Sequence, residues 1–273
     1  MATDGDGMHR REWLRRLAAA GAPCLLPLAP GAAATAAAQA PPRVAAAADL
    51  RVALTELAAR FEAAGQGRVS LVFGASGTLA RQIVDGAPFE LFLSADEAYV
   101  RQVVAARRAP DEGTLYAVGR LALFAPSGSP LRVDAECAGL RQLVGGTRPF
   151  RFAIANPAHA PYGRAAEAVL RHHGLWTALQ PSLVLGENVA QAAQFAAGGS
   201  TVGGLIAHAL AIAPPLARQG THTLIPAAHH PPLRQRLVLL AGAGSVSRRF
   251  RDFVLGQEGR GLLARYGFGP PPP

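Results

Sequence analysis

The stretch Val69–Asp85, V-S-L-V-F-G-A-S-G-T-L-A-R-Q-I-V-D, contains the pattern that decides the fold. Its first five residues, which are apolar except for Ser70, predict a strand. Gly74–Thr78 predicts a tight turn, and the residues that follow, through about Asp85, predict a helix. A strand that passes through a small-residue loop into a helix is the repeating unit of α/β proteins.

The same alternation continues on both sides of this stretch. Arg43–Ala47 predicts a buried strand, and apolar residues at 50, 53, 54, 57, 58 and 61 predict an amphipathic helix after it. Further strands are expected at 90–93, 121–125, 151–155, 182–185, 202–207 and 233–240, and further helices at 97–106, 163–173, 188–197 and 247–266. Because strands alternate with helices, we expect an α/β fold with mostly parallel sheets.

Proline-rich segments divide the predicted elements into two lobes. The strand at 121–125 ends at P-S-G-S-P, residues 126–130, and Pro231-Pro232 precedes the last strand. These segments predict one lobe from residues 43–121 plus 231–273 and a second lobe from residues 122–230. The proline tail, residues 269–273, is expected to be disordered.

Residues 1–40 have the order of an export signal. A basic start, H-R-R-E-W-L-R at 9–15, precedes an apolar stretch broken by three prolines and a small-residue end, A-A-A-Q-A at 36–40. The paired arginines resemble the twin-arginine class, and an ordinary secretory signal stays open, as does lipidation of Cys24. No later stretch has the roughly 18 uninterrupted apolar residues needed to cross a bilayer. We therefore expect a periplasmic or other extracytoplasmic protein.

Composition limits the classes of partner. The chain has 273 residues, 50% hydrophobic and 16% charged, which is enough apolar material for one or two cores. Its formal charge is +9, and every basic residue apart from the histidines is arginine. Because the arginines are scattered in runs of at most two, we expect no nucleic-acid partner, but a positive field that gathers small anions. Cys137 would be the single thiol after signal removal, which excludes an internal disulfide.

Four small-residue loops each deliver a strand into a helix N-terminus: Ala45–Asp49, Gly74–Thr78, Pro161–Gly163 and Glu187–Val189. A helix start presents free N–H donors and a positive dipole end, so it attracts anions. In α/β sheets the ligand lies beyond the carboxyl ends of the strands, where these loops are. We therefore expect two lobes to surround a small oxyanion with neutral donors. The loop at 74–78 matches neither a nucleophile elbow nor a phosphate-binding P-loop.

Seven blocks, in order, carry a resemblance to a known family: A-A-A-A-D-L (45–50), V-F-G-A-S-G-T-L-A-R-Q-I (72–83), G-A-P-F-E-L-F-L-S-A-D (86–96), A-N-P-A-H-A-P-Y-G-R (155–164), G-E-N-V-A-Q-A (186–192), H-H-P-P-L (229–233) and F-R-D-F-V-L through R-Y-G-F (250–268). They resemble the molybdate-binding proteins of ABC importers. The resemblance implies the type II periplasmic binding fold, with two α/β lobes, two crossover strands and the ligand between them. It also implies a monomer without cofactor or catalysis that binds molybdate or tungstate and delivers it to a membrane permease.

The resemblance implies ligand roles at five positions. Ser76 matches a serine that gives its hydroxyl and amide, and Tyr162 and Val189 lie where the family donates backbone amides. Ala48 and Ala207 depart from the family, which usually carries a serine in the first loop and often a tyrosine at the last position. The loss of two hydroxyl donors leaves open an alternative, the same fold binding sulfate, phosphate or a small organic acid.

Asp49 is expected to cap the helix that follows it, outside the pocket. Its carboxylate can accept the free N–H groups of the first turn. Inside a dry pocket the same carboxylate would repel a dianion. A hydrolase is the remaining hypothesis from another class, but no Ser-His-Asp arrangement can be placed by motif.

Histidines raise the hypothesis of a metal cation, with His172-His173, His229-His230 and His208 as candidates among the eight. Adjacent histidines on a helix do not share a face, and no H-E-x-x-H motif accompanies them. We therefore predict no cation site. His229 and His230 are expected to have a structural or hinge role, and His208, beside Ala207, is a candidate replacement donor for the anion.

Overall fold

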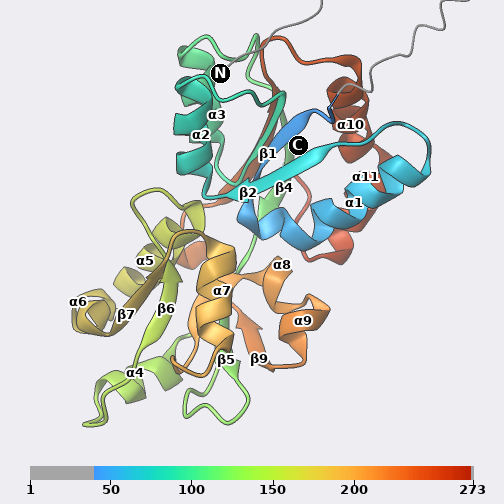
Figure 1. Cartoon of the computed structure of the whole chain (residues 1–273). Helices are drawn as coiled ribbons and strands as arrows, with labels where there is room; N and C mark the ends of the chain where they lie inside the picture. The colour runs from blue at the N-terminus through green and yellow to red at the C-terminus, as the bar shows by residue number, and fades with distance from the viewer. Residues whose placement is uncertain (1–39, 272–273) are drawn as a thin grey trace, which may run out of the picture. The chain divides into compact units, whose positions relative to one another are not determined.

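The computed structural model describes residues 40–271. The predicted export signal lies outside these residues except for Ala40, and so do Pro272 and Pro273. The described chain forms two five-stranded sheets flanked by helices (Figure 1). This arrangement confirms the α/β class predicted from the sequence.

The first sheet has the strand order β2-β1-β3-β10-β4. Its strands are β1 (Arg43–Ala47), β2 (Ser70–Gly74), β3 (Leu91–Ser94), β4 (Thr114–Gly119) and β10 (Leu233–Leu239). Its helices are η1 (Ala48–Leu50), α1 (Arg51–Ala63), α2 (Ser76–Val84), α3 (Glu97–Ala105), α10 (Ser245–Leu255) and α11 (Gln257–Arg265).

Alternation along the central strands gives this sheet two apolar faces. Val44 and Ala46 of β1 pack in a core with side chains from α1, α10 and α11. Ala45, between them, packs on the opposite face with side chains from α2 and α3. Successive side chains of a strand point to opposite faces, so one short run of small apolar residues binds helices on both sides. Figure 1 shows α2 and α3 side by side and α1, α10 and α11 across the sheet from them.

The second sheet has the order β7-β6-β8-β5-β9. Its strands are β5 (Leu121–Pro126), β6 (Phe152–Ala155), β7 (Leu183–Gly186), β8 (Gly204–Ala207) and β9 (Gly220–Leu224). Its helices are α4 (Ala138–Val144), α5 (Pro161–His172), α6 (Trp176–Leu179), η2 (Gln180–Ser182), α7 (Val189–Ala197), α8 (His208–Ala211), α9 (Pro214–Ala217) and η3 (Ala227–His229).

Both sheets are mixed, so the prediction of mostly parallel sheets was wrong. In the first sheet β1 pairs in parallel with β2 and β3, whereas β10 is antiparallel to β3 and β4. In the second sheet β6 pairs in parallel with β7 and β8, whereas β5 is antiparallel to β8 and β9. The antiparallel pairs involve the strands next to the two crossings between sheets, where no βαβ connection sets the direction.

The closing helix is two helices rather than the single one predicted from 247 to 266. Gly256 separates α10 from α11 with an extended backbone, at φ −72° and ψ 177°. A Cβ at Gly259 would lie 2.1 Å from the carbonyl oxygen of Val254, so α11 packs against the end of α10 at a distance that only glycine allows. The pattern of apolar residues continues across the break, and therefore it did not reveal the break.

The carboxyl end is ordered further than predicted. Gly269, the first residue of the predicted disordered tail, exchanges two backbone hydrogen bonds with Val118, at 2.8 and 2.9 Å. The lobe boundaries stay a prediction, because residues 40–273 form one compact unit. Within the described residues, every helix is too short or too polar to span a membrane.

Candidate functional site

All four loops predicted from the sequence meet at one small cavity. The cavity is lined by Ala47, Ala48, Asp49, Gly74, Ala75, Ser76, Ala95, Ala160, Pro161, Tyr162, Asn188 and Val189. Its volume of about 10 Å³ is near the lower limit for a single water-sized group. Arginine and histidine do not contribute to the lining of the cavity.

Helix starts supply the polar groups of this lining. α2 begins at Ser76, α5 at Pro161 and α7 at Val189. The backbone N–H groups of Ser76, Tyr162 and Val189 donate to no backbone carbonyl among residues 40–271. Asn188 caps α7 by accepting from the amides of Ala190 and Gln191, which leaves the Val189 amide free. Such amides carry the positive ends of the helix dipoles, so the cavity is a site for negative charge.

Ser76 provides a hydroxyl with a fixed direction. The side chain is fully buried, and its Oγ accepts a hydrogen bond of 3.0 Å from the amide of Ala95. The hydroxyl proton has no acceptor among residues 40–271, so it is free to bond to an anion in the cavity. The hydroxyl of Thr78, two residues further along, donates to the Glu187 carboxylate at 3.4 Å and does not line the cavity.

The other proposed ligand positions divide into two groups. Ala48, Tyr162 and Val189 line the cavity with Ser76, as the sequence predicted. Ala207 ends β8 and is fully buried, but it is not part of the lining. His208 next to it lies outside the lining as well, and its ring centroid is 5.5 Å from that of His222. The structure thus does not bring His208 to the anion as a replacement donor.

Asp49 does not have the capping role that we predicted. Its side chain caps neither η1 nor α1, and it is buried in the cavity wall. The prediction failed because a 3-10 turn, Ala48–Leu50, precedes α1 and turns residue 49 inward. Oδ2 accepts hydrogen bonds from the Tyr162 hydroxyl, at 3.0 Å, and from the Gln235 amide, whereas the buried Oδ1 has no partner among the described residues.

Burial decides the charge state of Asp49. It raises the pKa of the carboxyl group to about 6, although the hydrogen bonds from Gln235 and Tyr162 lower it. The donors therefore compensate only part of the lost hydration. A carboxyl group beside an anion site can thus become neutral by taking up a proton in mildly acidic solution.

The partners of Asp49 form a buried polar network behind the cavity. The Tyr116 hydroxyl donates to Oε1 of Gln235 at 2.6 Å, and Gln235 in turn donates to Asp49. Tyr116 and Gln235 belong to β4 and β10 of the first sheet, whereas Tyr162 belongs to α5 beside the second. The network joins elements of both sheets. Sequence reasoning missed Tyr116 and Gln235; the one signal was a glutamine at a buried position of an apolar strand.

Backbone contacts join the cavity loops to one another. The Gly77 amide, in the first turn of α2, donates to the carbonyl of His159 at 3.0 Å. The ring of His159 in turn lies 2.8 Å from the carbonyl oxygen of Glu187. The loops before α5 and α7 are thus connected to the start of α2, and the cavity is closed on that side.

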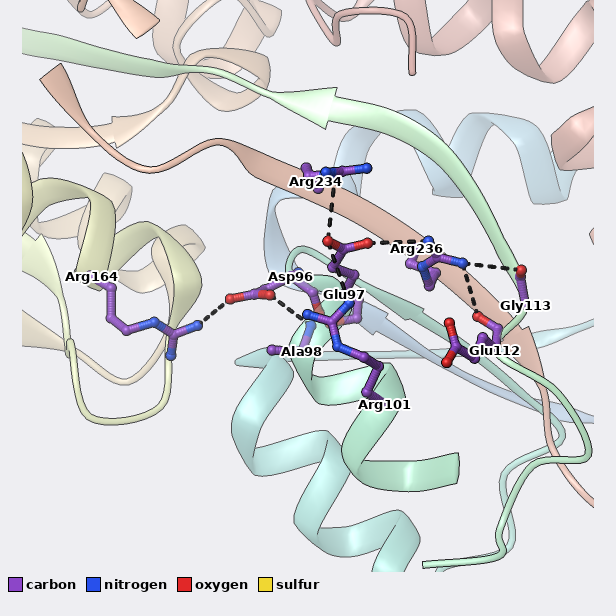
Figure 2. A network of polar contacts seen from close by, with 10 residues as sticks. Asp96, Glu97, Ala98, Arg101, Glu112, Gly113, Arg164, Arg234 and Arg236 are labelled. Atoms are coloured by element: carbon purple, nitrogen blue, oxygen red, sulfur yellow. Dashed lines mark hydrogen bonds and ion pairs between the residues drawn. The ribbon is translucent and has the colours of Figure 1, made fainter. Parts of the chain in front are cut away.

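A polar network lies beside these loops (Figure 2). Asp96 caps α3 through the Ala98 amide at 2.8 Å, and its other oxygen accepts from Arg164 of α5 at 2.6 Å. Arg164 also donates to the Tyr99 hydroxyl at 2.6 Å. These contacts connect the elements of the two sheets outside the cavity, where both charges stay partly exposed.

Glu97 is the second carboxylate of this network. Arg236 of β10 donates to it at 3.1 Å, and Arg234 and Arg101 lie 3.5 and 3.4 Å from it (Figure 2). Burial raises the pKa of Glu97, but the bond from Arg236 and the charges of Arg234 and Arg101 bring it below its usual value. The network uses arginines to hold α3 to β10, so these cations are engaged by protein carboxylates rather than by a ligand.

Three histidines come together away from the cavity. His172, His173 and His229 can each offer a ring nitrogen such that the three nitrogens lie within 4.8 Å of one another. We expected adjacent histidines on a helix to lie on different faces, but α5 ends at His172, and His173 already lies at its C-cap, so both rings reach the same place. His230 is separate, with Nδ1 2.8 Å from the carbonyl oxygen of Pro231.

Comparison with known proteins identifies the family of the chain and supports its fold. A family model described as bacterial extracellular solute-binding protein matches residues 42–269. The molybdate-binding protein of Rhodobacter capsulatus is 36% identical over 203 residues, 73% of this chain and 77% of that protein. The molybdate-binding protein of Azotobacter vinelandii is 32% identical over 236 residues, 83% of this chain and 89% of that protein.

A solved structure agrees with these relatives. The periplasmic molybdate-binding protein of Azotobacter vinelandii has a TM-score of 0.76 with this chain at 29% identity, covering 85% of this chain and 100% of that one. This likeness confirms the two-lobed α/β fold that the sequence predicted.

Proposed function

We propose that this chain, which belongs to the family of bacterial extracellular solute-binding proteins, captures molybdate or tungstate in the cavity between its two sheets. The observation that carries the proposal is the convergence of three helix starts, those of α2, α5 and α7, on one small cavity without a cation in its wall. The names and identities of the relatives support the same ligand.

Neutral donors suit a doubly charged ion in a dry site. Each amide or hydroxyl supplies a partial positive charge without the hydration cost of burying an arginine. Ala48 carries no hydroxyl, so the donors that remain are Ser76, with its hydroxyl and amide, and the amides of Tyr162 and Val189. Fixed amides fit one spacing of oxygen atoms, and size would then separate molybdate from sulfate. The alternative of a different anion in the same fold is not favoured by the relatives.

Membership of the family places the chain among binding proteins, and it is not an enzyme, so the hydrolase hypothesis is set aside. In this role the loaded protein works outside the cytoplasm and passes its ion to an ABC permease in the membrane. We propose that it does so as a monomer after removal of an amino-terminal export signal. Binding closes the lobes because the ion contacts donors from both sheets only in the closed form.

The proposal is tested by titrating the signal-free protein with molybdate, tungstate, sulfate and phosphate in a calorimeter. Ser76→Ala removes one donor to a charged group, which is worth about 1.5–3 kcal/mol, or roughly 10- to 150-fold in affinity. Thr78→Ala is the matched control, since it removes a hydroxyl two residues along that does not line the cavity. Heat with sulfate or phosphate but none with molybdate or tungstate would contradict the specificity. Equal affinities of the Ser76→Ala and parent proteins would place the ion elsewhere.

A further inference from the structure

The cluster of His172, His173 and His229 has the geometry of a group of metal ligands. The ring centroids of His172 and His229 are 4.2 Å apart, and His173 lies edge-on to both at 4.9 and 5.0 Å. The three rings come from two separate segments, the end of α5 and the turn η3. A tetrahedral site with metal–nitrogen distances near 2.1 Å needs ligand nitrogens about 3.4 Å apart. The ligand nitrogens of the three rings already lie within 4.8 Å of one another, and His172 is the exposed member of the cluster.

Two nitrogens of the cluster lack the partners that buried polar atoms normally have. Nε2 of His173 and Nδ1 of His229 are buried and have no hydrogen-bond partner among residues 40–271. An unpaired buried polar atom is costly, so such atoms in a folded protein call for an explanation. A bound cation would satisfy both at once. In support, burial lowers the pKa of His173, and the nearby rings of His229 and His172 lower it further, which favours the neutral imidazole that binds metals.

We propose that His172, His173 and His229 bind one divalent transition-metal ion, of the zinc, nickel or copper class, at a site separate from the anion cavity. Three neutral imidazoles are typical ligands of these ions, whereas magnesium and calcium prefer oxygen. The exposed side of His172 leaves a fourth position open to water. Glu136 and Arg141, the charged groups that face His173, have opposite signs and so do not exclude a cation.

The place of the site in the chain gives the metal a structural effect. His229 ends η3, in the connection that leads from β9 in the second sheet to β10 in the first. The ion would fix this connection to the carboxyl end of α5, the helix whose amino end lines the anion cavity. Metal binding should therefore raise the stability of the folded chain, since the three ligands are together only in the folded state.

The test uses the untagged full-length protein, stripped with a chelator and titrated with zinc chloride in a calorimeter. The variants are His229→Gln and His173→Gln, and His230→Gln is the matched control, adjacent in sequence but bonded to Pro231 instead. We expect one zinc per chain in the parent and control proteins, with a rise in melting temperature on zinc addition. The zinc affinity of each variant should be lower than that of the parent protein by more than roughly 10- to 100-fold, the loss that follows when only a supporting partner of a ligand is removed.

A second measurement separates coordination from folding. Cobalt chloride should give the parent protein the intense visible absorption of a tetrahedral site, and His229→Gln should abolish it. Tungstate affinity, measured on the same samples, should be the same in both variants as in the parent protein. An unchanged affinity shows that the variants are folded. Zinc bound equally by the parent and His229→Gln proteins, or not bound by the parent, would overturn the metal site without touching the anion proposal.

Discussion

Replacing Asp49 by asparagine removes a buried charge while keeping the shape of the side chain. Burial sets the pKa of this carboxyl group at about 6, against an ordinary value of 3.8. Because the pKa is raised in the folded state, at pH values between about 3.8 and 6 the folded protein keeps a proton that the unfolded chain has released. The contribution of Asp49 to stability is therefore present below about pH 4 and is lost as the pH rises through about 6.

The magnitude follows from the two pKa values. Their difference corresponds to about 3 kcal/mol, of which about 2–3 kcal/mol is lost between roughly pH 4 and pH 7. Asparagine cannot ionise, so the unfolding free energy of Asp49→Asn should rise relative to the parent by that amount over this range. Any cost of an unpaired amide at the position of Oδ1 is the same at every pH and cancels from the comparison.

Urea denaturation followed by circular dichroism measures this difference at several pH values. Asp252→Asn is the control, since it removes the same charge from a carboxylate whose side chain is 62% exposed. The unfolding free energy of the control should change with pH in the same way as that of the parent protein. If the unfolding free energy of Asp49→Asn also follows that of the parent between about pH 4 and pH 7, the reasoning is refuted, because the carboxyl group would then not be desolvated.

Three further outcomes are expected. Tungstate affinity, measured by calorimetry, should increase as the pH falls from about 7.5 to 5.5, because Asp49 loses its negative charge beside the cavity. In Asp49→Asn this pH dependence should be absent. Gly77→Ala should lower the free energy of unfolding by about 1–3 kcal/mol, because its Cβ would lie 2.7 Å from the His159 carbonyl oxygen; a urea midpoint equal to the parent's would refute this contact. Cys137 is fully buried, and burial, with the charge of Asp134, raises its pKa to about 12, so in a Cys24→Ser protein a thiol reagent should react only after denaturation.

Local patterns in the sequence predicted the cavity well. Small-residue loops before helices identified the four segments that the structure brings together, because strand and helix periodicities are local properties of the chain. The family resemblance then singled out Ser76, Tyr162 and Val189 within these loops, and all three line the cavity. The mixed sheet directions were not predictable in the same way, because β5 and β10 enter their sheets antiparallel to strands that lie far along the chain.

Contacts between distant segments set the limit of the prediction. Nothing near Asp49 in the sequence indicates that its carboxylate would meet Gln235, 186 positions away, rather than the amides of the next helix. The histidine cluster has the same origin, since His229 reaches the end of α5 from a separate turn. Both features involve polar groups whose roles depend on the packing of the whole chain.

The most direct test of the anion site is a crystal structure of the protein with tungstate, with the tungsten located by its anomalous scattering. The account predicts a single strong peak in the cavity, contacted by the Ser76 hydroxyl and by the amides of Ser76, Tyr162 and Val189, with no arginine in contact. A peak bound by arginine side chains elsewhere, or a cavity that stays without tungsten at saturating tungstate, would contradict it.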